Sequence, residues 1–100
     1  MIRGTTPTIR FTFNIIDPAQ VTAAYLTILQ GNKDVVEKDL SAATVGESFI
    51  EWTLSQENTL ALSKCPTCQI QARYKTVDGK AYASRIYTVN VADILKDGEI

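Results

Sequence analysis

The chain of 100 residues lacks histidine altogether. Histidine is the commonest general base, the usual partner of a nucleophilic serine or cysteine, and the commonest ligand of zinc. The motifs of nucleotide-binding loops, serine hydrolases and zinc proteases (GxGxxG, P-loop, GxSxG, HExxH) are also missing. Carboxylate pairs and lysines can still catalyse reactions, but an enzyme is less expected. We therefore predict a non-enzymatic protein without a cofactor.

Long apolar runs and clusters of like charge are missing as well. The longest apolar runs are a few residues long, against the roughly 20 that cross a bilayer. A secretory signal needs an apolar run of about 7–15 residues, and the opening MIRGTTPTIRFTF has none, so we expect it to belong to the mature protein. Ten basic and eleven acidic residues are scattered singly along the chain, which leaves no basic surface for nucleic acid. We expect neither a membrane nor a nucleic acid as partner.

The composition that remains is that of a folded domain. Hydrophobic residues make up 45% of the chain and charged residues 21%, close to the average of globular proteins. The length suits one domain with one core. We predict an N-terminal arm at residues 1–8, a β-domain at 9–92 and a C-terminal tail at 93–100.

Most of the chain alternates apolar and polar residues with a period of two, which indicates half-buried β-strands. The segment 23–30 carries apolar residues on both faces, so we predict it to be central in its sheet. The segment 81–91 is predicted to be the longest strand, and 39–47 is predicted to be a loop or a weak edge strand. The predicted strands are 8–13, 23–30, 35–38, 49–54, 69–76 and 81–91.

Short connections separate these strands. The sequences GNKD at 31–34 and VDGK at 77–80 predict hairpins, the second with a type I′ turn at Asp78-Gly79. Asp17-Pro18 predicts a turn. Ser55 is predicted to cap a short helical turn that crosses between two sheets. In the tail, one amphipathic turn is predicted around Ile94 and Leu95.

About six or seven strands with one short helical turn and no βαβ rhythm predict an all-β fold. Two packed antiparallel sheets, an immunoglobulin-like β-sandwich, suit this pattern because each strand has one face to bury. A small barrel is the alternative. Trp52 is the only tryptophan, and because Ile50 and Leu54 flank it on the same face, we interpret it as a core residue and not as a ligand platform.

Cys65-Pro66-Thr67-Cys68 is the one motif that suggests chemistry. A redox pair of the thioredoxin kind needs its first thiolate at the N-terminus of a helix, but here the motif precedes a predicted strand. Zinc needs two further ligands, which only carboxylates or a second subunit could supply. We interpret the motif as a tight turn entering a strand, with Cys68 as a small apolar residue and both thiols free. Cys65 and Cys68 stay the candidates for a metal or redox site.

The last predicted strand carries more apolar surface than one element of a sandwich needs. Tyr82, Ile86, Tyr87 and Val89 lie on both of its faces. Such a surplus marks either a contact with another subunit or a central strand covered by loops. Both interpretations stay open at this point.

The opening MIRGTTPT, which leads into an alternating strand, and the late hairpin TVDGKAYAS carry a resemblance to a known group. The chain is similar to short proteins encoded among the virion-assembly genes of tailed bacteriophages and prophages of Firmicutes. The resemblance runs through the whole chain and is clearest at these two ends. It implies a structural protein of the capsid, the head-to-tail connection or the tail and baseplate. It also implies localisation in the virion after assembly in the host cytoplasm.

Further expectations follow from this resemblance. Other phage structural proteins would be the partners, with a homo-oligomer in the particle. The group has no catalytic residues to carry over, and the CxxC motif is not matched to it. Two other classes stay open: a carbohydrate- or peptide-binding β-sandwich module, and a small CxxC redox or metal-binding protein.

We predict that residues 1–8 form an assembly arm that orders against a neighbouring subunit. Gly4 and Pro7 deter regular structure, while Thr5 and Thr6 are compatible with a strand. The alternative is an extension of the first strand within its own sheet. The predicted assembly contacts are Ile2, Arg3, Gly4, Thr5, Thr6, Pro7, Tyr82, Ile86 and Tyr87.

Overall fold

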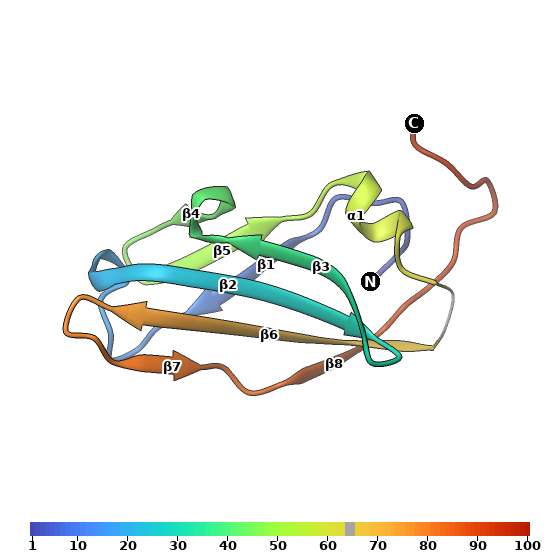
Figure 1. Cartoon of the computed structure of the whole chain (residues 1–100). Coiled ribbons are helices and arrows are strands. Elements are labelled where there is room, and N and C mark those ends of the chain that lie inside the picture. The colour runs from blue at the N-terminus through green and yellow to red at the C-terminus, as the bar shows by residue number, and fades with distance from the viewer. Residues whose placement is uncertain (64–65) are drawn as a thin grey trace.

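The computed structural model describes residues 1–63 and 66–100. Its helical elements are α1 (Gln56–Leu60) and two 3₁₀ turns, η1 (Pro18–Gln20) and η2 (Leu40–Ala42). The strands, labelled in Figure 1, are β1 (Thr8–Thr12), β2 (Val21–Gln30), β3 (Lys33–Asp39), β4 (Thr44–Val45), β5 (Phe49–Thr53), β6 (Thr67–Thr76), β7 (Ala81–Ala83) and β8 (Tyr87–Asn90).

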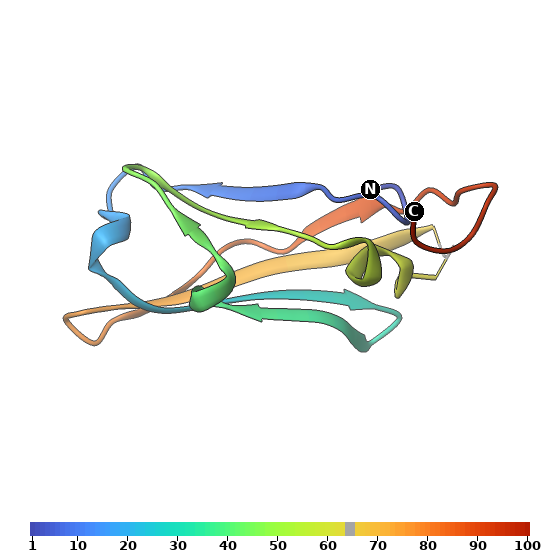
Figure 2. The ribbon, with the colours of Figure 1, turned by 90° about the horizontal axis from the view of Figure 1, so that it is seen from above.

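The strands form two facing antiparallel sheets. One sheet has the order β1-β5-β4, and the other has the order β3-β2-β6, with β7 and β8 both beside β6. Figure 2 shows β1 and β5 in one layer and β2, β3 and β6 in the other. With β1 taken as strand B, these orders correspond to B-E-D and C′-C-F-G of an immunoglobulin sandwich. The predicted all-β, immunoglobulin-like sandwich is confirmed.

The core lies between the sheets. Ile50, Trp52 and Leu54 from the first layer are each 1% exposed, and Leu26 and Ile28 of β2 are fully buried. The indole Nε1–H of Trp52 donates a hydrogen bond of 2.9 Å to the carbonyl oxygen at the end of β3, so its polar atom has a partner although the ring is buried. The interpretation of Trp52 as a core residue is confirmed, and β2 is central in its sheet as predicted.

The β2–β3 hairpin is tighter than the sequence predicted. Gly31 and Asn32 both have positive φ, 62° and 66°, which is the conformation of a two-residue type I′ turn. This turn lets Gln30 pair directly with Lys33. The predicted four-residue connection at 31–34 is therefore wrong, and β3 begins two residues earlier than predicted.

The β6–β7 hairpin is wider than predicted. In the connection between them only Gly79 has positive φ, 83°, so Asp78 does not take the type I′ conformation. The backbone N–H of Thr76 donates to the carbonyl of Lys80 at 3.0 Å across a three-residue connection. The Thr76 hydroxyl also donates to the Asp78 carboxylate. Glycine at the left-handed position of a three-residue loop satisfies this geometry.

The predicted single strand 81–91 is wrong, because a bulge divides it into β7 and β8. Ala83 lies opposite Arg73 and Tyr87 lies opposite Ile70, so three steps along β6 match four steps along its partner. Within the extra segment, the Ser84 hydroxyl accepts a hydrogen bond of 3.0 Å from a backbone N–H of β6. The longest strands are β2 and β6, with 10 residues each. This division, together with the short β4, raises the number of strands in the described residues above the predicted six or seven.

The helix α1 connects the two sheets, as predicted. Ser55 caps it: the Ser55 hydroxyl accepts from the Asn58 N–H at 3.1 Å, and the Asn58 side chain accepts from the Ser55 N–H at 3.0 Å. This reciprocal pair is a capping box. Across the described residues, no helix has the length and hydrophobicity that a membrane span requires.

Two further expectations near the C-terminal half are corrected. The strand β6 begins at Thr67, so Thr67 and Cys68 lie within the strand and not before it, while Cys65 lies outside the described residues. The amphipathic turn predicted around Ile94 and Leu95 is wrong. Ile94 is half-buried beside Gly4, whereas Leu95 is fully exposed, so no apolar face holds a helical turn there.

Candidate functional site

One edge of the first sheet is unpaired. Among the described residues, β1 pairs with β5 and with no other strand. Next to β1, the Pro7 carbonyl accepts a hydrogen bond from the β5 side at 2.9 Å, and the Phe13 N–H donates one at 2.7 Å. Hydrogen-bonding residues alternate along an antiparallel strand. Thr8, Arg10 and Thr12 therefore turn their N–H and C=O groups away from β5, toward open space.

The immunoglobulin strand order makes this edge conspicuous. In that fold, strand A lies beside strand B in the same sheet. Here β1 corresponds to strand B, and no described segment occupies the place of strand A. The place of one strand beside β1 is thus open.

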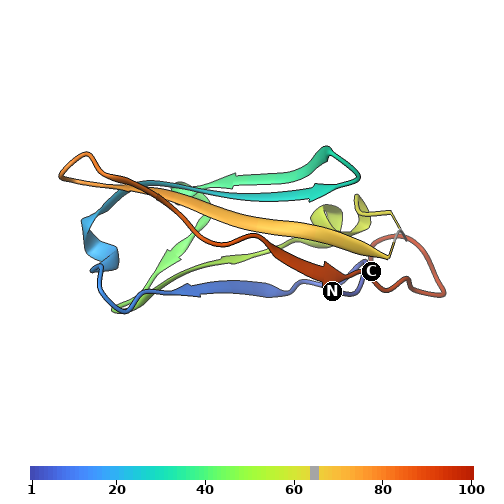
Figure 3. The same cartoon turned by 90° about the horizontal axis from the view of Figure 1, so that it is seen from below.

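The second sheet ends on the same side of the molecule. Figure 3 shows β1 at the edge of one layer and β8 at the edge of the other. Strand β8 pairs with β6 alone among the strands, and the bulge at 84–86 interrupts its alignment with β7. The Val91 N–H donates to the Pro66 carbonyl at 2.9 Å, so by the same alternation Thr88 turns its backbone groups outward.

An apolar groove lies between these two edges. Its volume is about 680 Å³, and it is lined by the edge of β1, by the middle of β6, and by residues of the bulge and of β8. The core is thus incompletely covered on this side, because several large side chains of the inward faces are only partly buried. The principal apolar side chains of the groove are Ile9, Phe11, Phe13, Ile70, Tyr74 and Tyr87.

Aromatic rings form two groups of contacts along the groove. Phe11 meets Trp52 edge-on at a centroid distance of 6.1 Å and lies 6.4 Å from Tyr87. Phe13 meets Tyr74 at 4.8 Å. The sequence predicted only a half-buried strand at these β1 residues, because alternation gives the direction of a side chain but not whether a strand covers it. No signal in the sequence distinguishes Phe11 from Trp52 in this respect.

The charge of the groove has one sign. Arg10 and Arg85 are the charged side chains among the described lining residues, and no carboxylate lines the groove. The Arg10 Nε is 2.8 Å from a Glu51 carboxylate oxygen, and its guanidinium lies 3.8 Å over the Phe49 ring. Arg85 has no ion pair within the described part of the chain, and its guanidinium carbon lies 5.1 Å from the Tyr87 ring centroid.

The predicted arm lies along its own domain. The Arg3 N–H donates to the Ala92 carbonyl at 2.9 Å, and the Ala92 N–H donates to the Met1 carbonyl at 2.8 Å. Ile2 and Ala92 form a parallel bridge, so residues 1–3 extend the edge of the second sheet. Pro7 already belongs to the ladder of the first sheet, and the segment therefore crosses from one layer to the other. Contact of this segment with a neighbouring subunit stays a prediction.

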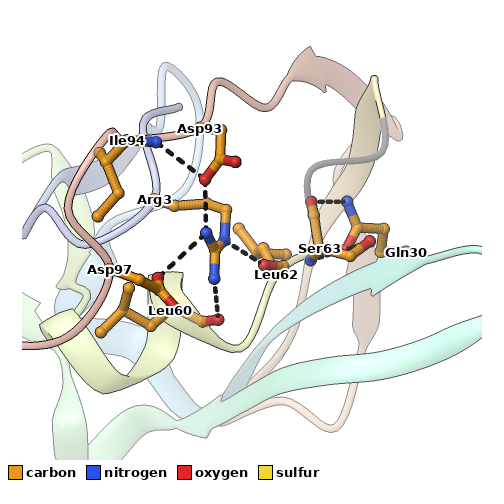
Figure 4. A network of polar contacts seen from close by, with 8 residues as sticks. All are labelled: Arg3, Gln30, Leu60, Leu62, Ser63, Asp93, Ile94 and Asp97. Carbon is orange, nitrogen blue, oxygen red and sulfur yellow. Dashed lines mark hydrogen bonds and ion pairs between the residues drawn. The ribbon is translucent and has the colours of Figure 1, made fainter.

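Arg3 ties this segment to two other parts of the chain (Figure 4). Its guanidinium donates to the carbonyl oxygens of Leu62 at 2.6 Å and Leu60 at 3.1 Å, at the end of α1. It also pairs with Asp93 at 2.6 Å and Asp97 at 3.4 Å. The hydrogen bond to Asp93 raises the pKa of Arg3 above its ordinary value. The side chain is 15% exposed, so it acts here as a structural clamp between the N-terminal segment, the end of α1 and the C-terminal tail.

The remaining predicted assembly residues take different positions. Tyr87 lines the groove, and so does Met1 of the predicted arm. Tyr82 stacks on Tyr74 with a centroid distance of 5.3 Å. Ile86, in the bulge, is 56% exposed. The structure thus brings Tyr87 to the groove, whereas Ile86 and Tyr82 are not among its lining residues.

The described cysteine of the CxxC motif is buried. Cys68 is 1% exposed, as expected for a small apolar residue. Desolvation raises the pKa of its thiol, which disfavours the reactive thiolate. Among the described residues, no group of three side chains is placed to hold a metal ion. The redox and metal interpretations of the pair depend on Cys65, which lies outside the described residues.

The groove has the features of a site that binds an extended chain. It combines an unpaired strand edge, an apolar floor and positive charge at the rim. Comparison of the chain with protein-family models, curated protein sequences and solved structures found no significant match.

Proposed function

We propose that the protein is a non-enzymatic structural component of a bacteriophage virion, in the capsid, the head-to-tail connection or the tail and baseplate. It acts through protein–protein contacts, not through chemistry. The observation that carries this proposal is the open side of the sandwich, where a strand edge and a groove of aromatic side chains face solvent together. The resemblance of MIRGTTPT and TVDGKAYAS to virion-assembly proteins supports the class of partner.

An uncovered strand edge is a binding surface for another chain. Unpaired N–H and C=O groups along a strand are a template for another chain, and proteins that act alone cover or disrupt such edges. Apolar patches beside them mark interaction surfaces. Main-chain hydrogen bonds along an edge bind a partner without special side chains. A virion component needs this kind of contact.

Two experiments test the proposal. The neighbourhood of the gene is the first: genes for portal, capsid or tail proteins are expected on either side. The second is the composition of particles purified by density gradient after prophage induction in the bacterium that carries the gene. Mass spectrometry should find the chain in a fixed ratio to the other virion proteins. Its absence from purified particles, while it is present in the lysate, would overturn the proposal.

The aromatic side chains of the groove favour one alternative, a carbohydrate- or peptide-binding module. Aromatic side chains in a groove can stack on sugars or cover apolar peptide side chains. A soluble oligosaccharide that raises the melting temperature of the isolated domain, together with absence from particles, would favour this alternative. No change with any oligosaccharide leaves the assembly role as the better account.

A further inference from the structure

We propose that the groove is filled by an extended segment of a partner protein, which adds as a strand beside β1 and carries apolar and acidic residues in alternation. This inference rests on the proposed function, because it names the surface, the binding mode and the chemistry of the partner that assembly requires. Three independent features of the groove carry it: its backbone edge, its apolar floor and its charge.

The backbone edge fixes the binding mode. Thr8, Arg10 and Thr12 present their N–H and C=O groups outward, and the described residues supply no partner for them. A strand in the place of strand A would satisfy these groups with a regular ladder. Threonine at both flanking positions favours strand pairing.

The apolar floor fixes the spacing of the partner's side chains. Alternate residues of an added strand point to the same face, so a five-residue segment directs two or three side chains inward. There they would cover Phe11, Phe13 and Tyr87, which the domain itself leaves partly exposed. Apolar residues at every second position of the partner satisfy this floor.

The positive charge of the groove favours a different protein, and not a second copy of this chain, as the partner. Arg85 has no ion pair within the described residues, and no described lining residue is acidic. A two-fold contact of this side with itself would place the arginines of both copies at one interface, and like charges across an interface are unfavourable. An acidic residue of the added strand is favourable instead where it lies next to Arg85, at the rim of the groove, or next to Arg10.

Two synthetic peptides probe the groove. One is a blocked eight-residue peptide in which valine alternates with glutamate and threonine, and the other has lysine in place of glutamate. Each is titrated into the full chain labelled with ¹⁵N. The acidic peptide is expected to shift the amide signals of Thr8, Arg10 and Thr12 and to slow their hydrogen exchange. It should bind about two- to five-fold more tightly than the basic peptide, the scale of one exposed ion pair.

Charge reversal provides the decisive comparison. Arg85→Glu should invert the preference, so that the basic peptide binds more tightly. The control Lys38→Glu reverses a charge on β3, far from the groove, and should leave the preference unchanged. Thr12→Pro removes an outward N–H and should weaken both peptides. Its circular dichroism spectrum verifies that it folds, and the Arg85 comparison stands without it.

Several results would overturn the inference. Amide shifts that map to β3 or β4, or a peptide preference that Arg85→Glu does not alter, would contradict the groove or its charge. A wild-type dimer in which the amides of Thr8, Arg10 and Thr12 are protected without any peptide would replace the partner by a second copy. Presence in the virion is measured separately in purified particles, so the proposed function can survive any of these results.

Discussion

The two sides of the sandwich treat their strand edges in opposite ways. On one side, β4 is two residues long and five of the seven residues of β3 are charged. Short and charged edges discourage pairing with other chains. On the other side, β1 carries one charge in five residues, Arg10, and its edge borders an apolar groove. The difference means that pairing with another strand is disfavoured at β3 and β4 and not disfavoured in this way at β1.

Coverage of the core differs in the same way. At the side of β3 and β4, here called the closed side, η2 connects these two edge strands, and the carbonyl of Asp39 accepts a hydrogen bond from the indole N–H of Trp52. Val36 of β3 is 4% exposed. At the open side, Phe11, Phe13 and Tyr74 are only partly buried. The open side therefore keeps apolar surface that the domain alone does not hide.

The largest loss of stability is expected at Trp52, in the core that both sides of the sandwich share. Trp52→Ala removes a ring that is 1% exposed and the hydrogen bond to the end of β3. We expect the free energy of unfolding to fall by about 3–5 kcal/mol, because truncation of a buried aromatic leaves a cavity. Urea denaturation followed by circular dichroism measures this loss. A loss below about 1 kcal/mol would mean that the two layers do not pack through Trp52.

A smaller effect on stability is expected on the open side. Phe11→Ala removes a side chain that is already partly exposed, so its loss should cost roughly 1–2 kcal/mol, less than full burial of such a side chain is worth. The same change should abolish the peptide-induced amide shifts at Thr8 and Thr12. The matched control Val45→Ala, on the exposed edge strand β4, should alter neither quantity. Unchanged peptide binding in Phe11→Ala would exclude the groove as the site.

Alternation was sufficient to predict the sandwich and the faces of its central strands. Ile50, Trp52 and Leu54 were assigned to the core and are buried, because a half-buried strand shows its inward face in the sequence. The predictions that were wrong concern features that depend on backbone hydrogen bonds. The bulge after Ala83 follows from the Ser84 hydroxyl taking a backbone N–H of β6, and nothing in the local pattern indicates it.

The groove was beyond sequence reasoning for a related reason. Phe11 on β1 and Trp52 on β5 belong to the same kind of alternating segment, yet only one of them has strands on both sides. Coverage depends on strand order, which a single sequence does not contain. Arg3 was assigned to a free arm, and its partners Leu60 and Asp93 lie 57 and 90 residues away.

The contacts of Arg3 allow a further test of how the N-terminal segment is held to the domain. Arg3→Gln removes the ion pair with Asp93 and the hydrogen bonds to the end of α1. We expect faster hydrogen exchange of the Ala92 amide, which is bonded to Met1, with a modest decrease in melting temperature. Exchange measured residue by residue by NMR tests this. Arg3→Lys, which keeps the charge, should restore part of the protection, and equal exchange in all three proteins would rule out the clamp.

The smallest expected effect is the loss of stability in acid that is due to Asp39, on the closed side. The Ser41 hydroxyl, which donates to the Asp39 carboxylate, is the main cause that holds the pKa of Asp39 below its ordinary value of 3.8. A carboxylate whose pKa is lower in the folded than in the unfolded state stabilises the fold above its unfolded pKa, and this contribution is lost as the pH falls through the folded pKa. The melting temperature of the wild type should therefore fall further between pH 6 and pH 2 than that of Asp39→Asn. The exposed control Asp34→Asn has no such hydrogen bond in the described structure and should follow the wild type. Equal acid sensitivity of Asp39→Asn and the wild type would mean that the hydrogen bond from Ser41 to this carboxylate does not stabilise the fold.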